Sequence, residues 1–380
     1  MRIIASILGF TILFIVLWEA FETVVLPRRV TRKFRLTRLF YRATWLPWST
    51  VARWIRTDKR RETFLGFYGP LSLLFLIVVW AAGLILGFAL LDWAAGSAFL
   101  ISQGTPNFWT DLYLSGTTFF TLGLGDIIPR STAERILAVT ESGMGFGFLA
   151  LVIGYLPVIY TSFSKREVTI SLLDARAGSP PTAAELLRRH SHDHGMEALR
   201  ELLLEWEHWS AELLESHLSY PLLAYYRSQH SNQSWLGALT AILDTCALVI
   251  VGLEGACEHQ AELTFAMARH AVVDLAQVFS TPPHSPEQDR LPPEELLRVR
   301  ADLAETGLHL RTGAPADAKL LELRQMYEPY VNALGRRLLL ALPPWMPKER
   351  RSDNWQSSAW GKITRAIAEE PSSVFEDDHF

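Results

Sequence analysis

The chain contains 380 residues, enough for two or three domains, and 49% of them are hydrophobic. This apolar fraction, together with 13 tryptophans, is high for a wholly soluble protein. The two cysteines, Cys246 and Cys257, are too few for a fold built on a disulfide framework.

The first apolar run begins at Ile3 and extends, through two glutamates, to about Leu26. At about 1.5 Å rise per residue, such a helix spans a bilayer core of about 30 Å. A secretory signal peptide is the alternative, with Arg2 as its charged start, but no small-x-small cleavage site follows. We predict that residues 1–26 form a retained transmembrane helix.

A strongly basic segment follows: residues 26–66 contain twelve Lys or Arg and two acidic residues, although the whole chain has a formal charge of −4. Short basic loops stay in the cytoplasm, so we predict a multi-pass protein of the cell membrane with residues 27–66 inside and the N-terminus outside. The charge can serve as this topology signal alone. Because it also alternates with aromatic residues, as in Arg53-Trp54-Ile55-Arg56, it predicts contact of residues 28–61 with anionic lipid.

Two more apolar runs follow, Phe64 to Leu91 without charge and Ile136 to Tyr160 with Glu141 as its single ionisable residue. Both are long enough to span a bilayer. Between them, Phe108 to Phe120 is too short to cross the membrane and is predicted to be a helix that enters and leaves on the same face.

The short helix leads into a glycine-spaced hexapeptide, Thr121-Leu122-Gly123-Leu124-Gly125-Asp126. A cation without its water needs several oxygens at fixed distance, and Gly123 and Gly125 allow the positive φ that aims successive carbonyls the same way. Thr121 adds its hydroxyl at one end of the ladder and Asp126 closes the other, facing outside. The two leucines turn their side chains into the surrounding protein.

This arrangement resembles the pore-loop potassium channels, including the bacterial and the two-pore-domain channels, over about residues 68–160. The hexapeptide is similar to the family motif Thr-Val-Gly-Tyr-Gly-Asp. The resemblance implies an all-α membrane protein with a pore domain at residues 67–163, made of outer helix, pore helix, filter and inner helix. It implies that four chains with one pore loop each form a passive, potassium-selective homotetramer that is no enzyme, with potassium held at Thr121, Leu122, Gly123 and Leu124.

Two departures from the family motif affect selectivity. Leu124 stands where the family usually has an aromatic residue, and Phe120 replaces the commoner threonine. A poorly selective cation channel on the same architecture is therefore an alternative. A membrane-anchored helical sensor that no longer conducts is another. Potassium is expected as the permeant ion with no other cofactor, and no nucleic-acid partner is expected.

Several side chains are expected to support the filter. Tyr113 stands where relatives often carry a tryptophan bonded to the filter aspartate, so it is read either as a donor to Asp126 or as part of the core packing. Glu141 is expected to find a partner in the hydroxyl of Ser115 or Thr117, with direct ion binding as the alternative.

The inner helix is expected to contain the gate. Gly145 is interpreted either as a hinge or as a site of tight packing against the pore helix. The residues expected to line the cavity and gate recur at helical spacing on one face: Phe146, Leu149, Ile153 and Pro157.

The C-terminal half is predicted to be a linker at residues 164–181, a cytoplasmic helical domain at 182–345 that controls the gate, and a loosely ordered tail at 346–380. Within the domain, residues 236–253 are apolar enough to be a further span, but Asp244 at their middle favours a buried core helix. The predicted helices are Ala183 to Arg189, Met196 to His217, Pro221 to Ser228, Trp235 to Glu254, Cys257 to Phe279, Pro293 to Leu310 and Ala316 to Leu342.

Two signals in this half bear on ligands. No Gly-x-Gly-x-x-Gly motif follows a strand, which argues against a dinucleotide-binding gate domain. The run His190-Ser191-His192-Asp193-His194 is read either as a transition-metal site or, more often for such a run, as a solvated cluster.

Overall fold

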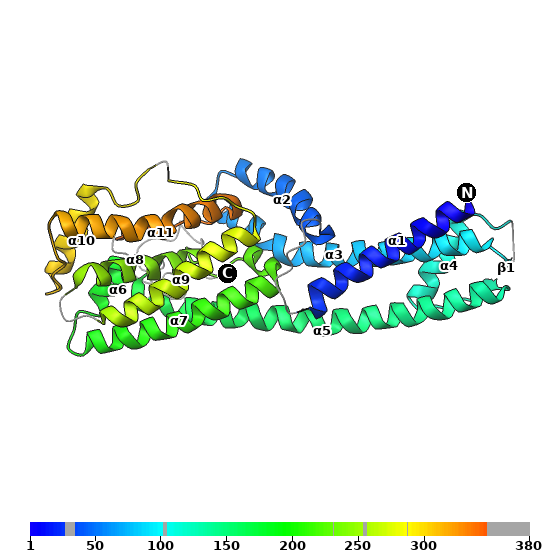
Figure 1. Cartoon of the computed structure of the whole chain (residues 1–380), viewed down its shortest axis with the longest axis horizontal. Helices are drawn as coiled ribbons and strands as arrows, with labels where there is room; N and C mark the ends of the chain where they lie inside the picture. The colour runs from blue at the N-terminus through cyan, green and yellow to red at the C-terminus, as the bar shows by residue number, and fades with distance from the viewer. Residues whose placement is uncertain (27–34, 102–104, 231, 254–256, 287, 348–380) are drawn as a thin grey trace, which may run out of the picture. The chain divides into compact units, whose positions relative to one another are not determined.

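The computed structural model describes residues 1–26, 35–101, 105–230, 232–253, 257–286 and 288–347 (Figure 1). The chain divides into two compact units, which we describe separately. The first comprises Met1–Trp54 and Phe67–Thr161, and the second comprises Ile55–Gly66 and Ser162–Phe380. Almost all of the predicted tail, residues 346–380, lies outside the described residues.

The first unit is helical apart from one short ribbon. Its elements are α1 (Arg2–Ala20) continued by a π-turn (Phe21–Val25), α2 (Leu36–Trp54), α3 (Asp58–Ala95), α4 (Phe108–Phe119) and α5 (Thr132–Ala177), with strands β1 (Phe99–Ile101) and β2 (Ile127–Pro129). The beginning of α3, up to Gly66, and the end of α5, from Ser162, belong to the second unit. The strands pair antiparallel, with Leu100 opposite Ile128. The predicted all-α membrane fold is confirmed, and the ribbon is an addition that the sequence did not predict.

Local capping fixes where α4 and α5 begin. The Asn107 side chain accepts from the backbone N–H of Trp109 (2.9 Å) and Thr110 (3.2 Å) and so caps α4. At α5, the Glu134 N–H donates to the Ser131 hydroxyl (3.2 Å) and the Glu134 carboxylate accepts from the Ser131 N–H (3.4 Å), which is a capping box. The stretch between these two caps contains α4 and, after it, residues 121–126.

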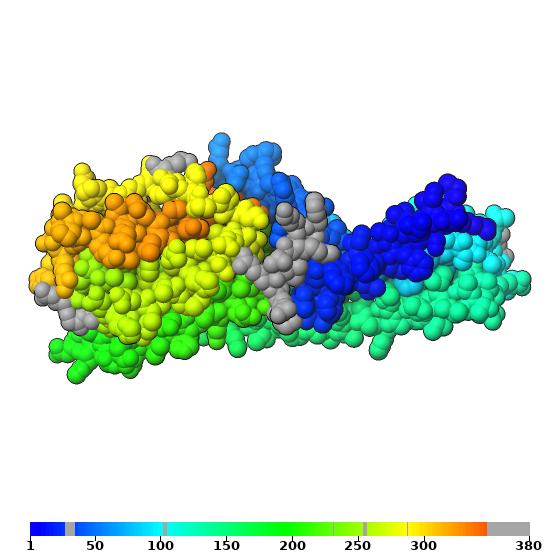
Figure 2. Space-filling model, in the orientation of Figure 1, coloured from blue at the N-terminus to red at the C-terminus, as the bar shows by residue number. Residues whose placement is uncertain are grey.

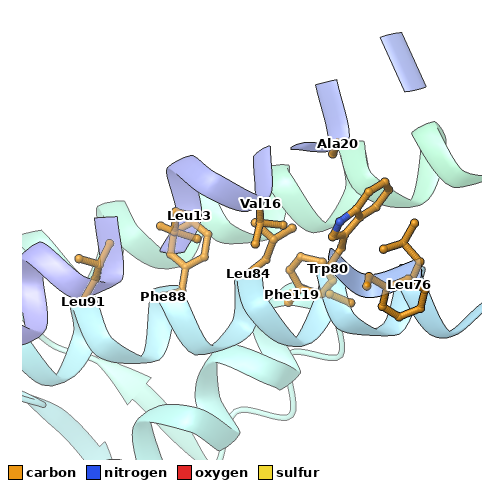
Figure 3. Close-up of a cluster of buried hydrophobic side chains, with 11 residues drawn as sticks. Leu13, Val16, Ala20, Leu76, Trp80, Leu84, Phe88, Leu91 and Phe119 are labelled. Atoms are coloured by element: carbon orange, nitrogen blue, oxygen red, sulfur yellow. The ribbon is translucent and has the colours of Figure 1, made fainter. Parts of the chain in front are cut away.

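Helix α1 packs antiparallel against α3 at close range. Gly83 and Gly87 lie one turn apart on α3, and a Cβ at Gly87 would stand 2.7 Å from the Leu13 side chain. Small residues at this spacing let membrane helices approach closely. Figure 3 shows the resulting apolar seam, whose labelled residues are Leu13, Val16 and Ala20 of α1, Leu76, Trp80, Leu84, Phe88 and Leu91 of α3, and Phe119 of α4. In Figure 2 one face of α1 is not covered by other helices. Several of its large apolar residues, such as Ile7, Phe10 and Phe14, are exposed, as expected for a lipid-facing helix.

The second unit is a bundle around a buried central helix. Its elements are α6 (Ala183–Arg189), α7 (Gly195–Ser219), a 3₁₀ turn η2 (Pro221–Tyr225), α8 (Trp235–Gly252), α9 (Glu258–Val278), α10 (Pro293–Ala304) and α11 (Ala314–Leu338). Helix α8 packs against α6, α9 and α11, and α7 packs against α9. Most predicted helices are present within a few residues. Two differ from the prediction. Residues 221–225 form a 3₁₀ turn instead of the predicted helix from Pro221 to Ser228, and α10 ends at Ala304 rather than Leu310 because Gly307 takes positive φ (83°) in the turn that follows.

Among the described residues, four helices are long and apolar enough to cross a membrane: α1 with its π-turn, α3, α5 and α8. Helix α8 differs from the others because nearly all of its residues are buried in the second unit. Its Asp244 is ion-paired with Arg290 (2.6 Å) and accepts a hydrogen bond from Tyr327. This environment fits the predicted buried core helix rather than a fourth span.

The segment predicted as a linker, residues 164–181, is different in the structure. Helix α5 does not end near Tyr160 but continues to Ala177, and Ile170 and Leu173 are buried in the second unit. The helix continues because no Gly or Pro occurs between Tyr160 and Gly178, which takes positive φ (81°) and is soon followed by Pro180. Residues 164–177 are therefore part of the helical bundle.

Candidate functional site

The residues from Thr121 to Asp126 are exposed and connect α4 to β2. Three of them take positive φ: Thr121 (56°), Gly123 (56°) and Gly125 (76°). Positive φ at every second residue alternates the hand of the backbone and turns successive carbonyls toward the same side. A carbonyl ladder for a dehydrated cation requires this alignment.

Thr121 also ends α4. Its N–H donates to the Thr118 carbonyl (2.9 Å), and the Leu122 N–H donates to the Thr117 carbonyl (2.8 Å). These two bonds form a Schellman cap, in which the residue at the position of Thr121 is left-handed and is usually glycine. A β-branched residue with positive φ is strained. The motif predicted positive φ at the two glycines but contained no signal for Thr121.

The far end of the hexapeptide is held from two sides. Tyr113 on α4 lies close enough to Asp126 for their side chains to interact, and a hydrogen bond between them stays a prediction. Strand β2 begins at Ile127, directly after Asp126, and its pairing with β1 ties this end of the hexapeptide to the segment that follows α3. Alternation in these three-residue strands is too short to be recognised in the sequence.

Glu141 of α5 contacts one of its two expected partners. Its Oε1 lies 2.5 Å from the Ser115 Oγ, which also lies 2.7 Å from the Ile85 carbonyl oxygen. The Thr117 hydroxyl donates instead to the Leu114 carbonyl (2.9 Å). Because Ser115 has one hydroxyl hydrogen for two oxygens, a Ser115 that donates to Ile85 needs Glu141 as the donor in the other bond. The contact joins α3, α4 and α5 at one point.

Three further carboxyl groups are buried at the ribbon end of the unit, and the sequence did not single them out. Asp92 on α3, Asp111 on α4 and Glu134 on α5 are at most 3% exposed and lie close enough to interact electrostatically. The Ser97 hydroxyl donates to Asp111 (3.1 Å), and the Ala98 N–H donates to Glu134. Within the described part of the chain, Asp111 Oδ1 is buried without a hydrogen-bond partner. With Ser115, Asp111 makes one polar side of α4 that faces the two long helices.

Gly145 packs directly on the end of α4. A Cβ at this position would lie 1.9 Å from the Phe119 carbonyl oxygen, whereas a Cβ at Gly143 or Gly147 would meet nothing within 4 Å. Helix α5 is continuous through Gly145. The structure thus gives Gly145 the packing role, and a hinge there stays a prediction.

The four residues expected to line the gate lie on one side of α5. Phe146, Leu149 and Ile153 are 71%, 56% and 62% exposed, and Pro157 is also exposed. A row of large apolar side chains without cover in its own chain marks a surface that meets lipid, a further copy of the chain or a shared path.

The histidine run does not form a metal centre in the structure. The described residues contain no group of three His, Cys, Asp or Glu side chains placed to hold a metal ion. His190 is buried with Nδ1 2.7 Å from the Leu186 carbonyl, whereas His192 is exposed. His194 takes positive φ (63°) just before α7. The run functions here as the turn between α6 and α7.

Comparison with known proteins supports the pore architecture. Residues 72–161 match the family model described as ion channel. An uncharacterised membrane protein of Bacillus subtilis (strain 168), YdjJ, is 22% identical over 281 residues, which cover 73% of this chain and 76% of the relative. No solved structure matches the chain.

The matched segment contains α4, the hexapeptide and most of the apolar parts of α3 and α5. Residues 72–161 are therefore a pore-loop ion channel domain, and the resemblance read from the sequence is confirmed. The similarity to YdjJ is longer than this domain, so it includes sequence outside the pore.

Proposed function

We propose, starting from the ion channel domain at residues 72–161, that four copies of this chain surround one axis and conduct potassium ions passively across the membrane. The observation that carries the proposal is the positive φ at Thr121, Gly123 and Gly125, which aims the carbonyls of one strand to one side. Potassium bound at Thr121, Leu122, Gly123 and Leu124 is the transported ion. No bond is made or broken, so the activity is transport and not catalysis.

The number of copies follows from the geometry of coordination. One strand supplies carbonyls from a single direction, and a bare cation needs oxygens on all sides. Closed symmetry supplies them most simply by repeating the strand about an axis. Leu122 and Leu124 are 60% and 62% exposed in the single chain, and neighbouring copies would cover them. The same holds for the exposed apolar face of α5.

Selectivity for potassium over sodium rests on the hexapeptide. Both glycines and the threonine of the family motif are present, and Tyr113 lies close enough to Asp126 to support the outer end. Leu124 cannot form the phenolic hydrogen bond that braces the filter in many relatives, and this supports a poorly selective cation channel as the second candidate.

Gating by the second unit is supported by the way this unit binds α5. Arg166 is buried and donates to the carbonyls of Leu223 (2.8 Å) and Tyr226 (2.9 Å). The Phe163 ring packs against that of Tyr226 in a tilted arrangement, with centroids 5.4 Å apart. The segment formed by residues 221–227 thus holds the end of the inner helix through buried hydrogen bonds.

The same segment also holds the beginning of the outer helix. Arg227 Nη1 lies 3.4 Å from the Glu62 carboxylate of α3 and donates to the Leu339 carbonyl (3.0 Å) beyond α11. A rearrangement of residues 221–227 therefore acts on α3 and α5 together. A ligand of the second unit can move the gate by as much as its affinity differs between the closed and open states.

The membrane orientation follows from the distribution of charge. Lys and Arg are concentrated in residues 26–66 and are absent from residues 63–129, which favours a cytoplasmic second unit and an external N-terminus in the cell membrane.

Reconstitution of the purified full-length protein into planar bilayers tests the proposal. We expect discrete currents whose reversal potential under opposed potassium and sodium gradients lies near the potassium equilibrium potential. A reversal potential near zero would establish the poorly selective channel instead. A protein of verified tetrameric mass that carries no current would favour the non-conducting sensor, and a stable particle of two or six chains would contradict the architecture.

A further inference from the structure

Within the first unit, helix α2 packs against α3 along one of its faces. The Tyr68 ring of α3 packs against Trp45 and Trp48, with ring centroids 4.8 Å and 5.7 Å apart, and its hydroxyl lies 2.9 Å from the Thr44 hydroxyl. One turn before Thr44, the Phe40 ring packs on a further aromatic residue of α3 (5.3 Å). This buried face sets the rotation of α2 about its own axis.

The first turn of α2 is held at the end of α1. The Glu19 carboxylate accepts hydrogen bonds from the backbone N–H (3.1 Å) and the hydroxyl (2.8 Å) of Thr37. Glu22 lies 3.9 Å from the Arg35 guanidinium. Because α1 is long and apolar enough to span the membrane, the helix that starts at its end begins at the membrane surface. The two glutamates at the end of this span thus have a role that the sequence did not reveal.

The opposite face of α2 is uncovered and has two parts. Its middle is apolar, with Leu39, Leu46 and Trp54 exposed at 62%, 58% and 77%. Along one edge, exposed arginines occur at positions spaced by four and eleven residues, which are about one and three helical turns: Arg38, Arg42 and Arg53. Among the described residues, these three arginines have no ion-pair partner.

We propose that this face of α2 binds the headgroups of anionic phospholipids in the bilayer around the channel. The apolar middle enters the boundary of the acyl chains, and the arginine edge contacts the phosphates, the arrangement of helices that lie in a membrane interface. Both charge complementarity and continuity with the membrane helices α1 and α3 favour lipid over a protein partner. The sequence predicted lipid contact for the whole of residues 28–61, whereas this proposal assigns it to three arginines of α2.

The test counts lipids bound to the full-length protein in detergent by native mass spectrometry, with phosphatidylglycerol and phosphatidylcholine titrated separately. We expect the natural protein to bind phosphatidylglycerol more tightly than phosphatidylcholine. The triple variant Arg38→Gln, Arg42→Gln, Arg53→Gln should lose at least tenfold in affinity for phosphatidylglycerol, since each arginine near an anionic surface contributes roughly fivefold. The corresponding triple lysine variant should keep most of the preference, which separates loss of charge from misfolding.

A matched control neutralises three exposed arginines elsewhere, Arg130, Arg200 and Arg298, and should leave lipid binding unchanged. Equal binding of the two lipids by the natural protein would overturn the proposal. So would an equal loss in the control, or a glutamine triple variant that binds phosphatidylglycerol as the natural protein does. A glutamine triple variant whose oligomeric mass falls would show that the face binds another copy of the chain, which also overturns it. The readout is independent of conduction, so a protein that passes no current can still support this inference.

Discussion

The Glu62 carboxylate in the first turns of α3 lies 3.4 Å from the guanidinium of Arg227, the last residue of the segment that also binds Arg166 of α5. The guanidinium is buried (9% exposed), whereas the Glu62 side chain is 46% exposed. Burial lowers the pKa of Arg227 to about 10, and Glu62 opposes that shift. The pair is placed to link the outer helix to the inner helix through one short segment.

This pair predicts non-additive effects on gating. Glu62→Gln and Arg227→Gln should each change the open probability in bilayers by roughly fivefold or more, the lower end of ordinary coupling energies of about 1 kcal/mol. The double variant should change it no further than Arg227→Gln alone does, because Glu62→Gln removes a contact that the loss of Arg227 has already removed. Arg200→Gln, which breaks an exposed pair with Glu197 (2.7 Å), is the control and should have no effect. Additive changes, or an altered single-channel conductance, would refute the linkage.

The positive φ of Gly123 predicts loss of conduction on substitution by alanine. A Cβ at Gly123 meets nothing within 4 Å in its own chain, so the cost arises from the backbone conformation and not from crowding. Gly116→Ala is a matched control, since Gly116 also has open space but helical φ. We expect Gly123→Ala to assemble without conducting and Gly116→Ala to conduct. Normal currents from Gly123→Ala would show that residues 121–126 do not form the filter.

The Ser115 and Glu141 contact predicts a coupled effect on stability. Ser115→Ala leaves the Glu141 carboxyl buried without this partner, at a cost of about 1–3 kcal/mol. In a Glu141→Leu background the same substitution should cost less, because the partner is gone. Thermal melting of the detergent-solubilised protein measures both differences. Equal costs in the two backgrounds would mean that the contact contributes nothing.

The buried, neutral ring of His217 predicts that the second unit becomes less stable as the pH falls. Its Nδ1 lies 2.8 Å from the Leu213 carbonyl and its Nε2 3.3 Å from Arg166, a pure donor, so the ring is neutral with its hydrogen on Nδ1. Burial, and then the charge of Arg166, lower the pKa of His217 to about 3 from 6.5. The unfolded chain therefore binds a proton first as the pH falls. This contribution to stability is complete above pH 6.5 and declines below it, by at most about 1.4 kcal/mol per pH unit.

Melting temperatures between pH 7 and pH 5 test this expectation against His217→Gln, which retains a donor and an acceptor. The variant should lose less stability over this range than the natural protein. The slope of its unfolding free energy against pH should be smaller by up to about 1.4 kcal/mol per pH unit, which corresponds to one proton. Exposed His208→Gln serves as the control. Identical slopes in all three proteins would contradict the assignment.

Gly145 predicts that α5 tolerates no side chain where it meets α4. Gly145→Ala places a methyl group against the Phe119 carbonyl and should destabilise the protein by about 1–3 kcal/mol, measured as a lower Tm. Gly147→Ala, which meets nothing within its own chain, should have a small effect. Equal melting of the two variants would argue against this contact.

Local signals predicted the pore elements well, and long-range contacts account for what was missed. The short helix α4 was expected at Phe108 to Phe120 and occurs at Phe108–Phe119, because its cap, its length and the following glycines all lie within a few residues. The buried carboxyls Asp92, Asp111 and Glu134 come from three helices, and no sequence spacing relates them. Likewise, the continuation of α5 beyond Tyr160 depends on burial of Ile170 and Leu173 by the bundle, which a change from apolar to mixed composition does not reveal.

The contact of Gly145 with Phe119 has a mechanical meaning. Phe119 is the last residue of α4, and two residues later Thr121 opens the filter as the strained cap of that helix. Because backbone touches backbone at Gly145, no flexible side chain lies between the inner helix and this cap to absorb a displacement. A shift of α5 by a few tenths of an ångström must therefore be matched by α4 or relieved by Thr121. Under the proposed function, a movement of the inner helix would therefore reach the carbonyls of residues 121–126 through this backbone contact.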